Sequence, residues 1–278
     1  MIIVDMQQVM LSSLLISLDK HTEINESLIR HMILNSLRYN NMKFKNKYGH
    51  IVIACDGNEY WRRDIFPYYK AARRKAREKS PINWNEVFKI LNSIRDEIKE
   101  VFPYPVIHYK KAEADDIIAT IVKQNNEQTL ILSGDHDFIQ LHNDSVDQYD
   151  PTRKKWVSHL NPSLYIKEHI IRGDAGDGVP NIMSKDNVFV LGERQRKIMT
   201  KSLEAWLILE PEQFCNETML RNYHRNDMLI NLNKIPKEVS DAILTEYGIQ
   251  REKSKKNLFD YFREKKLTNL METIHEFQ

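Results

Sequence analysis

The sequence predicts an α/β protein with a mostly parallel central sheet flanked by helices, followed by a smaller helical part. Two observations predict this fold class. Up to about residue 160, short apolar runs alternate with amphipathic stretches, as in parallel strands joined by right-handed helical crossovers. Beyond Pro162, apolar residues recur mainly at helical spacing. We therefore expect an α/β core over residues 1–160 and a helical domain over residues 161–278.

The first half of the chain predicts strands and helices in alternation. Residues 51–55 are apolar throughout, which is typical of a parallel strand covered on both faces. Residues 146–149 and 155–158 predict a hairpin around the turn at Asp150-Pro151. The other expected strands are 2–4, 106–107 and 129–132, and the expected helices are 7–18, 23–45, 84–101 and one ending near 125.

A basic, aromatic segment interrupts this alternation between Trp61 and Lys79, and we expect an arch at about residues 58–80. Only Asp64 and Glu78 oppose its charge. Cations for phosphates and rings for stacking suit single-stranded nucleic acid, whereas a plain solvated helix face has no use for four rings. The cations are Arg62, Arg63, Lys70, Arg73, Arg74, Lys75, Arg77 and Lys79, and the rings are Trp61, Phe66, Tyr68 and Tyr69.

The second half predicts helices around one tight turn. Residues 173–180 contain three glycines, which allow left-handed conformations in such a turn. Residues 253–256 are basic and are expected to be exposed. The expected helices are 164–172, 202–209, 212–223, 237–247 and one or two within 258–277.

Acidic residues recur where the expected strands end. Asp5, Asp56 and Asp135 each follow an apolar strand, and parallel strands place their carboxyl ends along one sheet edge. Residues 111–118 bring further carboxylates to the start of a helix, where the dipole favours negative charge. Singly, strand-end aspartates often cap a turn, and a charged first turn often has no function. Together the predicted cluster comprises Asp5, Asp56, Glu113, Asp115, Asp116, Asp135, Asp137, Asp174 and Asp177.

So many carboxylates resist joint ionisation unless cations lie among them. Oxygen ligands select hard ions such as Mg²⁺, with Mn²⁺ as a substitute. Two such ions about 4 Å apart are a known arrangement for phosphodiester hydrolysis. The cluster therefore predicts a site for two metal ions and no Ser-His-Asp arrangement.

At these residues the chain resembles the flap endonuclease, or 5′-nuclease, family, whose core is PIN-like. Its acidic motifs are similar to Ile3-Val4-Asp5, Ile53-Ala54-Cys55-Asp56-Gly57, Glu113-Ala114-Asp115-Asp116, Ser133-Gly134-Asp135-His136-Asp137-Phe138 and the turn Gly173 to Asp177. The phage ribonuclease H branch is closer. Its motifs resemble Tyr60-Trp61-Arg62-Arg63-Asp64, Tyr68-Tyr69-Lys70, Lys75-Ala76-Arg77-Glu78, Lys154-Lys155-Trp156-Val157 and Gly192-Glu193-Arg194.

The resemblance implies a two-metal nuclease, exonuclease and flap endonuclease, acting 5′ to 3′ on primer RNA and flap DNA in phage lagging-strand replication. Lys70 and Arg73 would steer the scissile phosphate. The first metal would take Asp5, Asp56, Glu113, Asp115 and Asp135, the second Asp137, Asp174 and Asp177, and Asp116 matches a further acidic position. Nucleic-acid contacts would come from Arg62, Arg63, Tyr69, Arg74, Lys75, Arg77 and Lys185.

The resemblance also implies partners and a location. The substrates would be branched or nicked duplex DNA and RNA–DNA hybrids with 5′ ends, bound by a monomer in the cytoplasm of the infected host cell. A single-stranded-DNA-binding protein and a sliding clamp are the implied protein partners. One departure concerns residues 180–185, which read Pro-Asn-Ile-Met-Ser-Lys where relatives often carry a glycine-rich hairpin that grips the duplex and holds potassium.

Composition indicates whether the chain is a membrane, a secreted or an intracellular protein. No run of about eighteen apolar residues predicts a membrane span, and the chain starts directly in a strand-like segment rather than a signal peptide. Cys55 and Cys215 show neither disulfide nor metal spacing, which is typical of intracellular proteins. Two alternatives remain open. A small toxin-like ribonuclease would share the acidic site without the arch, and a non-catalytic junction-binding protein would have lost the ligands.

Overall fold

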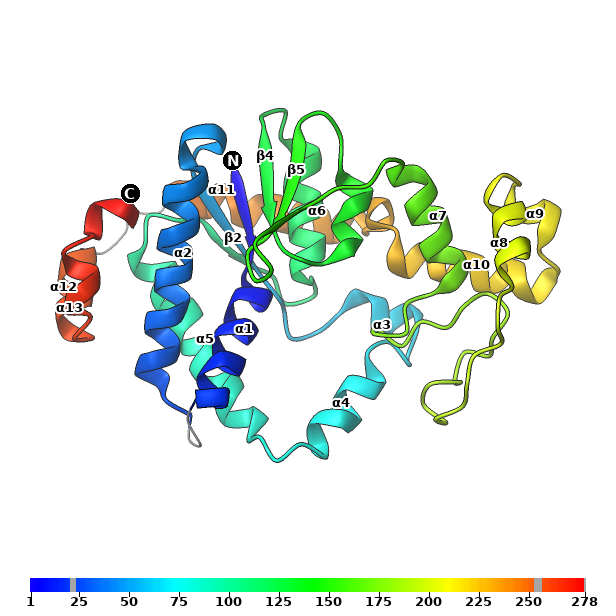
Figure 1. Ribbon diagram of the computed structural model, residues 1–278, viewed down its shortest axis with the longest axis horizontal. Coiled ribbons are helices and arrows are strands. Elements are labelled where there is room, and N and C mark those ends of the chain that lie inside the picture. The colour runs from blue at the N-terminus through cyan, green and yellow to red at the C-terminus, as the bar shows by residue number, and fades with distance from the viewer. Residues whose placement is uncertain (21–23, 253–256, 278) are drawn as a thin grey trace.

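A six-stranded sheet forms the centre of the molecule in the computed structural model, which describes residues 1–20, 24–252 and 257–277 (Figure 1). The strands lie in the order β3-β2-β1-β4-β5-β6, and all neighbours are parallel except β5 and β6. The predicted mostly parallel α/β fold is therefore confirmed. The strands are β1 (Ile2–Asp5), β2 (Ile51–Cys55), β3 (Val106–His108), β4 (Thr129–Leu132), β5 (Val146–Asp150) and β6 (Lys155–Val157).

Helices cover both faces of the sheet because successive strand residues point to opposite sides. Ile2 and Val4 belong to one apolar core, and Ile3 belongs to the other. The first core is closed by α1 (Met6–Lys20), α2 (Glu26–Tyr48) and α5 (Trp84–Val101). The second is closed by α6 (Ala114–Gln124), α11 (Lys237–Glu252) and the 3₁₀ helix η1 (His136–Leu141).

The basic segment leaves the sheet as a separate arch between β2 and α5 (Figure 1). It contains two short helices, α3 (Trp61–Ile65) and α4 (Ala71–Glu78). Tyr60 stands just before α3, and Lys70 stands just before α4 in a left-handed conformation with φ of 55°. The arch therefore bends at Lys70 rather than forming one continuous helix.

The remaining helices lie beyond the edge of the sheet and begin with α7 (Pro162–Arg172). The expected helix over 212–223 is wrong, since the chain breaks there into two helices. Asn216 causes the break, because its side-chain oxygen accepts a hydrogen bond from the amide of Met219 and starts a new helix. After α7, the helices of this part are α8 (Thr200–Leu207), α9 (Pro211–Phe214), α10 (Glu217–Ile230) and the 3₁₀ helix η2 (Leu232–Lys234). The break separates α9 from α10.

The C-terminal segment returns to the α/β half instead of joining the outer helices. Its elements are α12 (Leu258–Glu264), α13 (Thr268–Met271) and η3 (Ile274–Phe277), whose apolar side chains join the first core beside α2 and α5. A boundary at residue 160 therefore does not coincide with a division between cores. The expected exposure of residues 253–256 concerns a segment outside the described residues.

Candidate active site

Three strand ends bring carboxylates to one edge of the sheet, where the strand order reverses on either side of β1. Asp5 ends β1, Asp56 follows β2 and Asp135 follows β4. The Ser133 hydroxyl donates a 2.9 Å hydrogen bond to Asp5 Oδ2, and the Ala114 amide donates one of 2.8 Å to Asp56 Oδ1. The start of α6 is thereby fixed at the same edge, with Asp115 in its first turn. This reversal point is where α/β proteins form binding crevices.

The crowding of these carboxylates changes their acidity. Burial, together with the charges of Asp56 and Asp135, raises the pKa of Asp5 to about 7. Burial followed by repulsion from Asp135 raises the pKa of Asp115 well above its ordinary value. The carboxylates of this group therefore repel one another when they are ionised. A bound metal ion would relieve that repulsion, and carboxylate oxygens are suitable ligands for it.

The second group of carboxylates combines η1 with the glycine turn after α7. The Asp137 amide donates a 3.0 Å hydrogen bond to Asp135 Oδ1, so the start of η1 links the two groups. Burial, together with Asp177 and Asp137, raises the pKa of Asp174 to about 6. Gly178 adopts a φ of 76°, and an added Cβ would lie 3.2 Å from the Tyr68 carbonyl oxygen. The positive φ favours glycine there, and the close approach of the turn to the arch leaves little room for a side chain.

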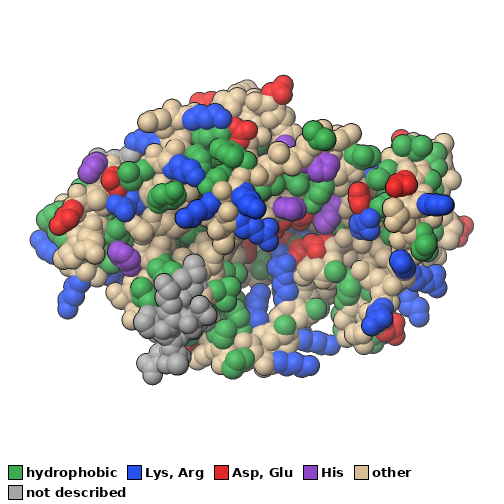
Figure 2. All heavy atoms as spheres, in the orientation of Figure 1, with side chains coloured by type: hydrophobic (Ala, Val, Ile, Leu, Met, Phe, Trp, Pro, Cys, Tyr) green, Lys and Arg blue, Asp and Glu red, His purple; other side chains and the backbone are tan. Residues whose placement is uncertain are grey.

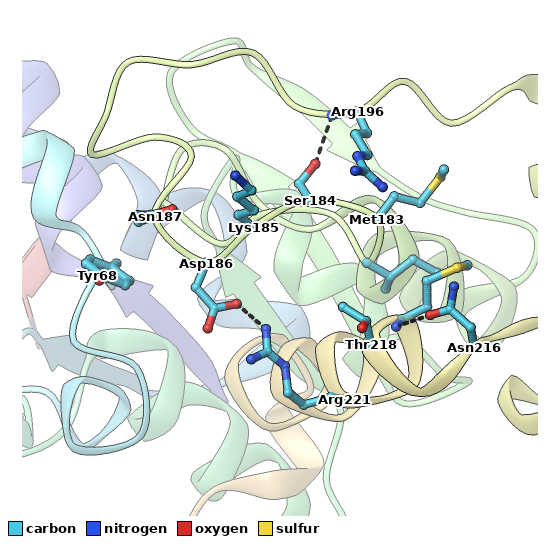
Figure 3. A pocket seen from close by; sticks show the side chains of 12 residues that line it. Tyr68, Met183, Ser184, Lys185, Asp186, Asn187, Arg196, Asn216, Thr218 and Arg221 are labelled. Carbon is cyan, nitrogen blue, oxygen red and sulfur yellow. Dashed lines mark hydrogen bonds and ion pairs between the residues drawn. The ribbon is translucent and has the colours of Figure 1, made fainter.

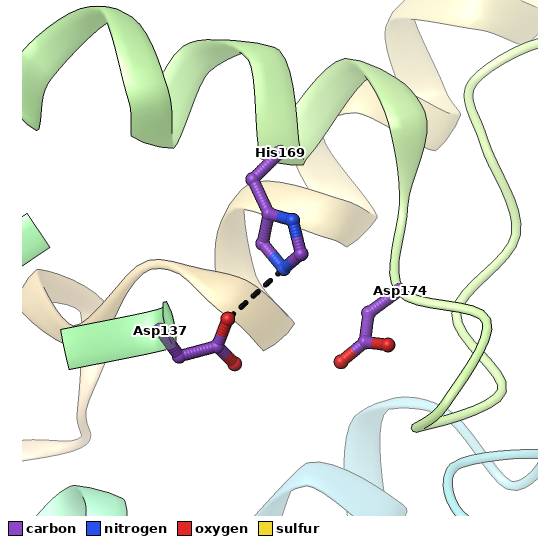
Figure 4. A group of neighbouring side chains, drawn as sticks. All are labelled: Asp137, His169 and Asp174. Atoms are coloured by element: carbon purple, nitrogen blue, oxygen red, sulfur yellow. Dashed lines mark ion pairs between the residues drawn. The ribbon is translucent and has the colours of Figure 1, made fainter. Parts of the chain in front are cut away.

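His169 on α7 faces the same group, and the sequence analysis did not identify it. Ligand atoms of Asp137, His169 and Asp174 all lie within 4.8 Å of one another (Figure 4). The signal for His169 was weak, because a single histidine inside an amphipathic helix is usually a packing residue. Only the position of α7 against η1 brings its ring to the site.

Cations at the base of the arch occupy the space between the acidic groups. Lys70 forms an ion pair with Glu113, and its Nζ lies 3.4 Å from Asp177 Oδ2. Arg73 forms an ion pair with Asp177. Burial alone would raise the pKa of Asp177, but Lys70 and Arg73 hold it below its ordinary value. Glu113 and Asp177 are thus compensated by protein cations, unlike the carboxylates on either side.

Asp116 differs from the expectation that it approaches a metal ion. Its side chain is fully buried, and its Oδ2 accepts hydrogen bonds from the Glu113 amide at 2.9 Å and Trp61 Nε1 at 3.1 Å. Arg62 Nη2 lies 2.8 Å from its other oxygen. We correct its expected role: Asp116 caps α6 and anchors the arch, because its position in the helix turns it towards the protein interior.

Arg62 and Tyr69 also differ from the expectation that they contact nucleic acid. The Arg62 guanidinium is buried between Glu113 and Asp116, and it donates a 2.7 Å hydrogen bond to the Leu229 carbonyl. The Tyr69 ring is buried, with its hydroxyl 2.8 Å from both Glu113 and Asp177. Both side chains instead join the arch to the acidic cluster, because apolar neighbours draw this end of the arch inwards.

The other expected nucleic-acid contacts remain at the surface. The side chains of Arg63, Arg74, Lys75 and Arg77 are exposed on the arch. Figure 2 shows acidic side chains at the central hollow of this face, with Lys and Arg side chains around it. An anionic polymer that reached the acidic cluster would pass between these cations.

Lys185 lies apart from the arch, in a groove of about 670 Å³ beside α10. Its side chain is exposed, and Tyr68, Ser184 and Arg196 also line the groove (Figure 3). Asp186 does not leave the groove acidic, because Arg221 and Arg225 pair with it at 2.7 and 2.5 Å. The groove therefore carries a net positive charge on a partly apolar lining, and Tyr68 of the arch forms part of that lining.

A carboxylate cluster at the reversal point of a parallel sheet, roofed by a basic arch, defines a nuclease of the 5′-nuclease class. The comparisons agree with this class. Residues 14–169 match the model of the 5′-3′ exonuclease N-terminal resolvase-like domain, and residues 161–277 match that of the T4 RNase H C-terminal region. The chain therefore belongs to the 5′-3′ exonuclease family, in the bacteriophage T4 ribonuclease H branch, which confirms the family resemblance.

Individual relatives place it more closely. Ribonuclease H of Enterobacteria phage T4 is 34% identical over 99% of this chain and 95% of its own length. Flap endonuclease Xni of Shewanella sp. (strain MR-4) is 28% identical over 48% of this chain and 52% of its own. A bacteriophage T5 protein crystallised with metal ions shares the fold, with a TM-score of 0.63 at 16% identity, covering 90% of this chain and 99% of its own.

The length and apolar character of the helices decide whether any of them could span a membrane. Across residues 1–20, 24–252 and 257–277, no helix combines the length and the apolar character needed to cross a bilayer.

Proposed function

We propose that this chain is a metal-dependent 5′→3′ nuclease with exonuclease and flap endonuclease activity. It would hydrolyse phosphodiesters of RNA primers in RNA–DNA hybrids and of 5′ DNA ends or flaps. The observation that carries the proposal is the convergence of two carboxylate groups on either side of Lys70 and Arg73. Excess negative charge beside cations that could meet a phosphate suits phosphodiester cleavage.

Two Mg²⁺ ions fit the carboxylates, and Mn²⁺ could substitute for them. Asp5, Asp56, Glu113, Asp115 and Asp135 would hold or approach the first ion, and Asp137, Asp174 and Asp177 would hold or approach the second. The raised pKa values of Asp5 and Asp174 support this, because burial and neighbouring carboxylates outweigh the favourable interactions of these two groups. When bound, the ions would supply the activated water and neutralise charge growing on the phosphate.

The chain's own cations would position the substrate. Lys70 and Arg73 now neutralise Glu113 and Asp177, and their charges lie where a scissile phosphate would approach. Arg63, Arg74, Lys75 and Arg77 would guide a single strand through the arch. Lys185 and the groove beside α10 would take the duplex, in place of the glycine-rich hairpin of relatives.

The names of the relatives support the substrate class. They are a ribonuclease H and a flap endonuclease, and a phage T5 flap endonuclease of the same fold was solved in a complex with DNA and metal ions. We extend the proposal to phage lagging-strand replication in the host cytoplasm. The protein would act there as a monomer, with a single-stranded-DNA-binding protein and a sliding clamp as candidate partners.

A single substitution tests the proposal. Asp135 lies between the two carboxylate groups, so Asp135→Asn should lower cleavage of a labelled 5′-flap DNA by about 10³-fold or more while flap binding survives. Asp241→Asn is the control, because Asp241 is an exposed residue on α11 whose carboxylate pairs with Lys237 of the same helix. Single-turnover cleavage should require Mg²⁺ and stop with a chelator. Flap binding without Mg²⁺-dependent cleavage would instead indicate a non-catalytic junction-binding protein.

A further inference from the structure

The imidazole of His169 adds a nitrogen to an otherwise oxygen-lined site. Its Nε2 lies 3.1 Å from Asp137 Oδ1, and Asp174 points into the same space from the turn after α7 (Figure 4). Ligand atoms of the three side chains are all within 4.8 Å of one another, a separation that one ion can span. Their positions come from three different elements, namely η1, α7 and the glycine turn.

Two features leave this nitrogen available to an ion. Nε2 is buried from solvent, and it is ion-paired with Asp137 at 3.1 Å without a hydrogen bond of good geometry, so an ion could take its place between the two groups. The ring also stacks on Tyr165, with centroids 5.9 Å apart and planes 12° from parallel, which fixes its orientation. A buried ring nitrogen held against two carboxylates, without an aligned partner, is arranged as a metal ligand would be.

We propose that the second metal position is a mixed nitrogen–oxygen site, with His169 Nε2, Asp137 and Asp174 as ligands, that favours first-row transition ions such as Mn²⁺ over Mg²⁺. The inference rests on the proposed two-metal function and assigns a ligand and a metal preference to it. Mg²⁺ strongly prefers oxygen ligands in a strict octahedron, whereas imidazole binds transition ions well. The first position, formed by Asp5, Asp56 and Asp115, offers oxygens and should accept Mg²⁺.

Pulsed electron paramagnetic resonance of bound Mn²⁺ tests the ligand directly. The wild-type protein loaded with two equivalents of Mn²⁺ should show nitrogen modulation from a coordinated imidazole. His169→Gln and His169→Asn should both lose that modulation. His136→Gln should keep it, because His136 is an exposed neighbour of Asp135 outside the three-residue group. Absence of nitrogen modulation in the wild-type protein, or its persistence in both His169 variants, would overturn the assignment.

Calorimetric titration tests the metal preference on the same proteins. His169→Gln should weaken Mn²⁺ binding at one site by about 10-fold or more and change Mg²⁺ binding by less than about 3-fold. Equal losses for both ions would show that His169 does not set a preference. Circular dichroism melting verifies that each variant is folded. The resonance test on the wild-type protein does not depend on any variant.

The two proposals fail in different ways. If Mn²⁺ binds at two sites without nitrogen modulation, the His169 assignment is wrong and the two-metal function stands. If Asp137→Asn and Asp174→Asn both leave Mn²⁺ stoichiometry and affinity unchanged, the second metal position itself is wrong, and the proposed function loses its support there.

Discussion

Lys70 shows how one residue's backbone conformation delivers charge to the site. Its φ of 55° is uncommon for a side chain with a Cβ, and its amide donates a 2.7 Å hydrogen bond to the Asp177 carbonyl. The turn in front of it can approach because Gly178 has no side chain. The bend at Lys70 therefore directs the Lys70 ammonium group towards Glu113 and Asp177 rather than towards solvent.

We predict that Lys70→Ala affects chemistry more than binding. The single-turnover rate on a saturating flap substrate should fall by about 10²–10³-fold, because a cation beside the phosphate is lost. The dissociation constant should change by less than about 3-fold. Alanine and lysine both carry a Cβ, so the backbone strain at this positive φ is about the same in the variant and in the wild-type protein.

Lys75→Ala is the matched control for that prediction. Lys75 is exposed on α4, so its loss should weaken binding and reduce the salt dependence by about one unit of slope, with the saturated rate unchanged. If Lys70→Ala cleaves at full speed once saturated, the base of the arch only guides the substrate.

At the scale of elements, α4 is held by few contacts. None of its eight side chains, all of them described, is buried, and four of them are cationic. A helix this short is marginal in water, and its like charges repel one another. Its tertiary contacts include the ion pair of Arg73 with Asp177, Arg77 over the Phe88 ring at 5.1 Å, and Lys75, which donates to the Val190 carbonyl at 3.3 Å. Nucleic-acid phosphates would supply anionic partners for Lys75 and Arg77.

We therefore predict that trypsin cleaves the free protein first within residues 71–79. Saturating flap DNA should slow that cleavage by about 10-fold or more, because bound phosphates order the helix. Mass spectrometry of early fragments provides the measurement. Lys237 and Arg251 on α11 are internal controls, since α11 packs against α6 and β3. Cleavage at α11 as early as at α4 would contradict the prediction.

Across the whole molecule, the C-terminal helices complete the core of the α/β half. Phe262 on α12 is fully buried, and its ring lies 6.0 Å from that of Phe102 and 5.3 Å from that of Phe277. Glu97 on α5 reinforces the contact, because it accepts hydrogen bonds from Arg30, Tyr261 and Lys265. The beginning and end of the chain should therefore unfold together.

We predict that Phe262→Ala lowers the free energy of unfolding by about 3–5 kcal/mol. Phe259→Ala, on the same helix but 46% exposed, should change it by less than about 1 kcal/mol. Urea unfolding followed by circular dichroism and by nuclease activity measures both, and the two signals should shift together. An unchanged transition of the α/β core would mean that the C-terminal helices form a separate unit.

By itself, the sequence determined the strands, most helices and the chain positions of the acidic and basic residues. Apolar period and length specify a strand or a helix locally, and parallel strands then bring their carboxyl ends to one edge. The carboxylates after β1, β2 and β4 could therefore be predicted to meet. The break at Asn216 escaped prediction because the apolar pattern continues through it.

Only the tertiary structure decided which neighbouring side chains face the site. Arg62 and Arg63 are adjacent in the sequence and equally charged, yet packing buries the first against Asp116 and leaves the second exposed. His169 reaches Asp137 because α7 packs on η1. These side-chain orientations depend on contacts between residues far apart in the chain. They cannot be predicted from the local sequence.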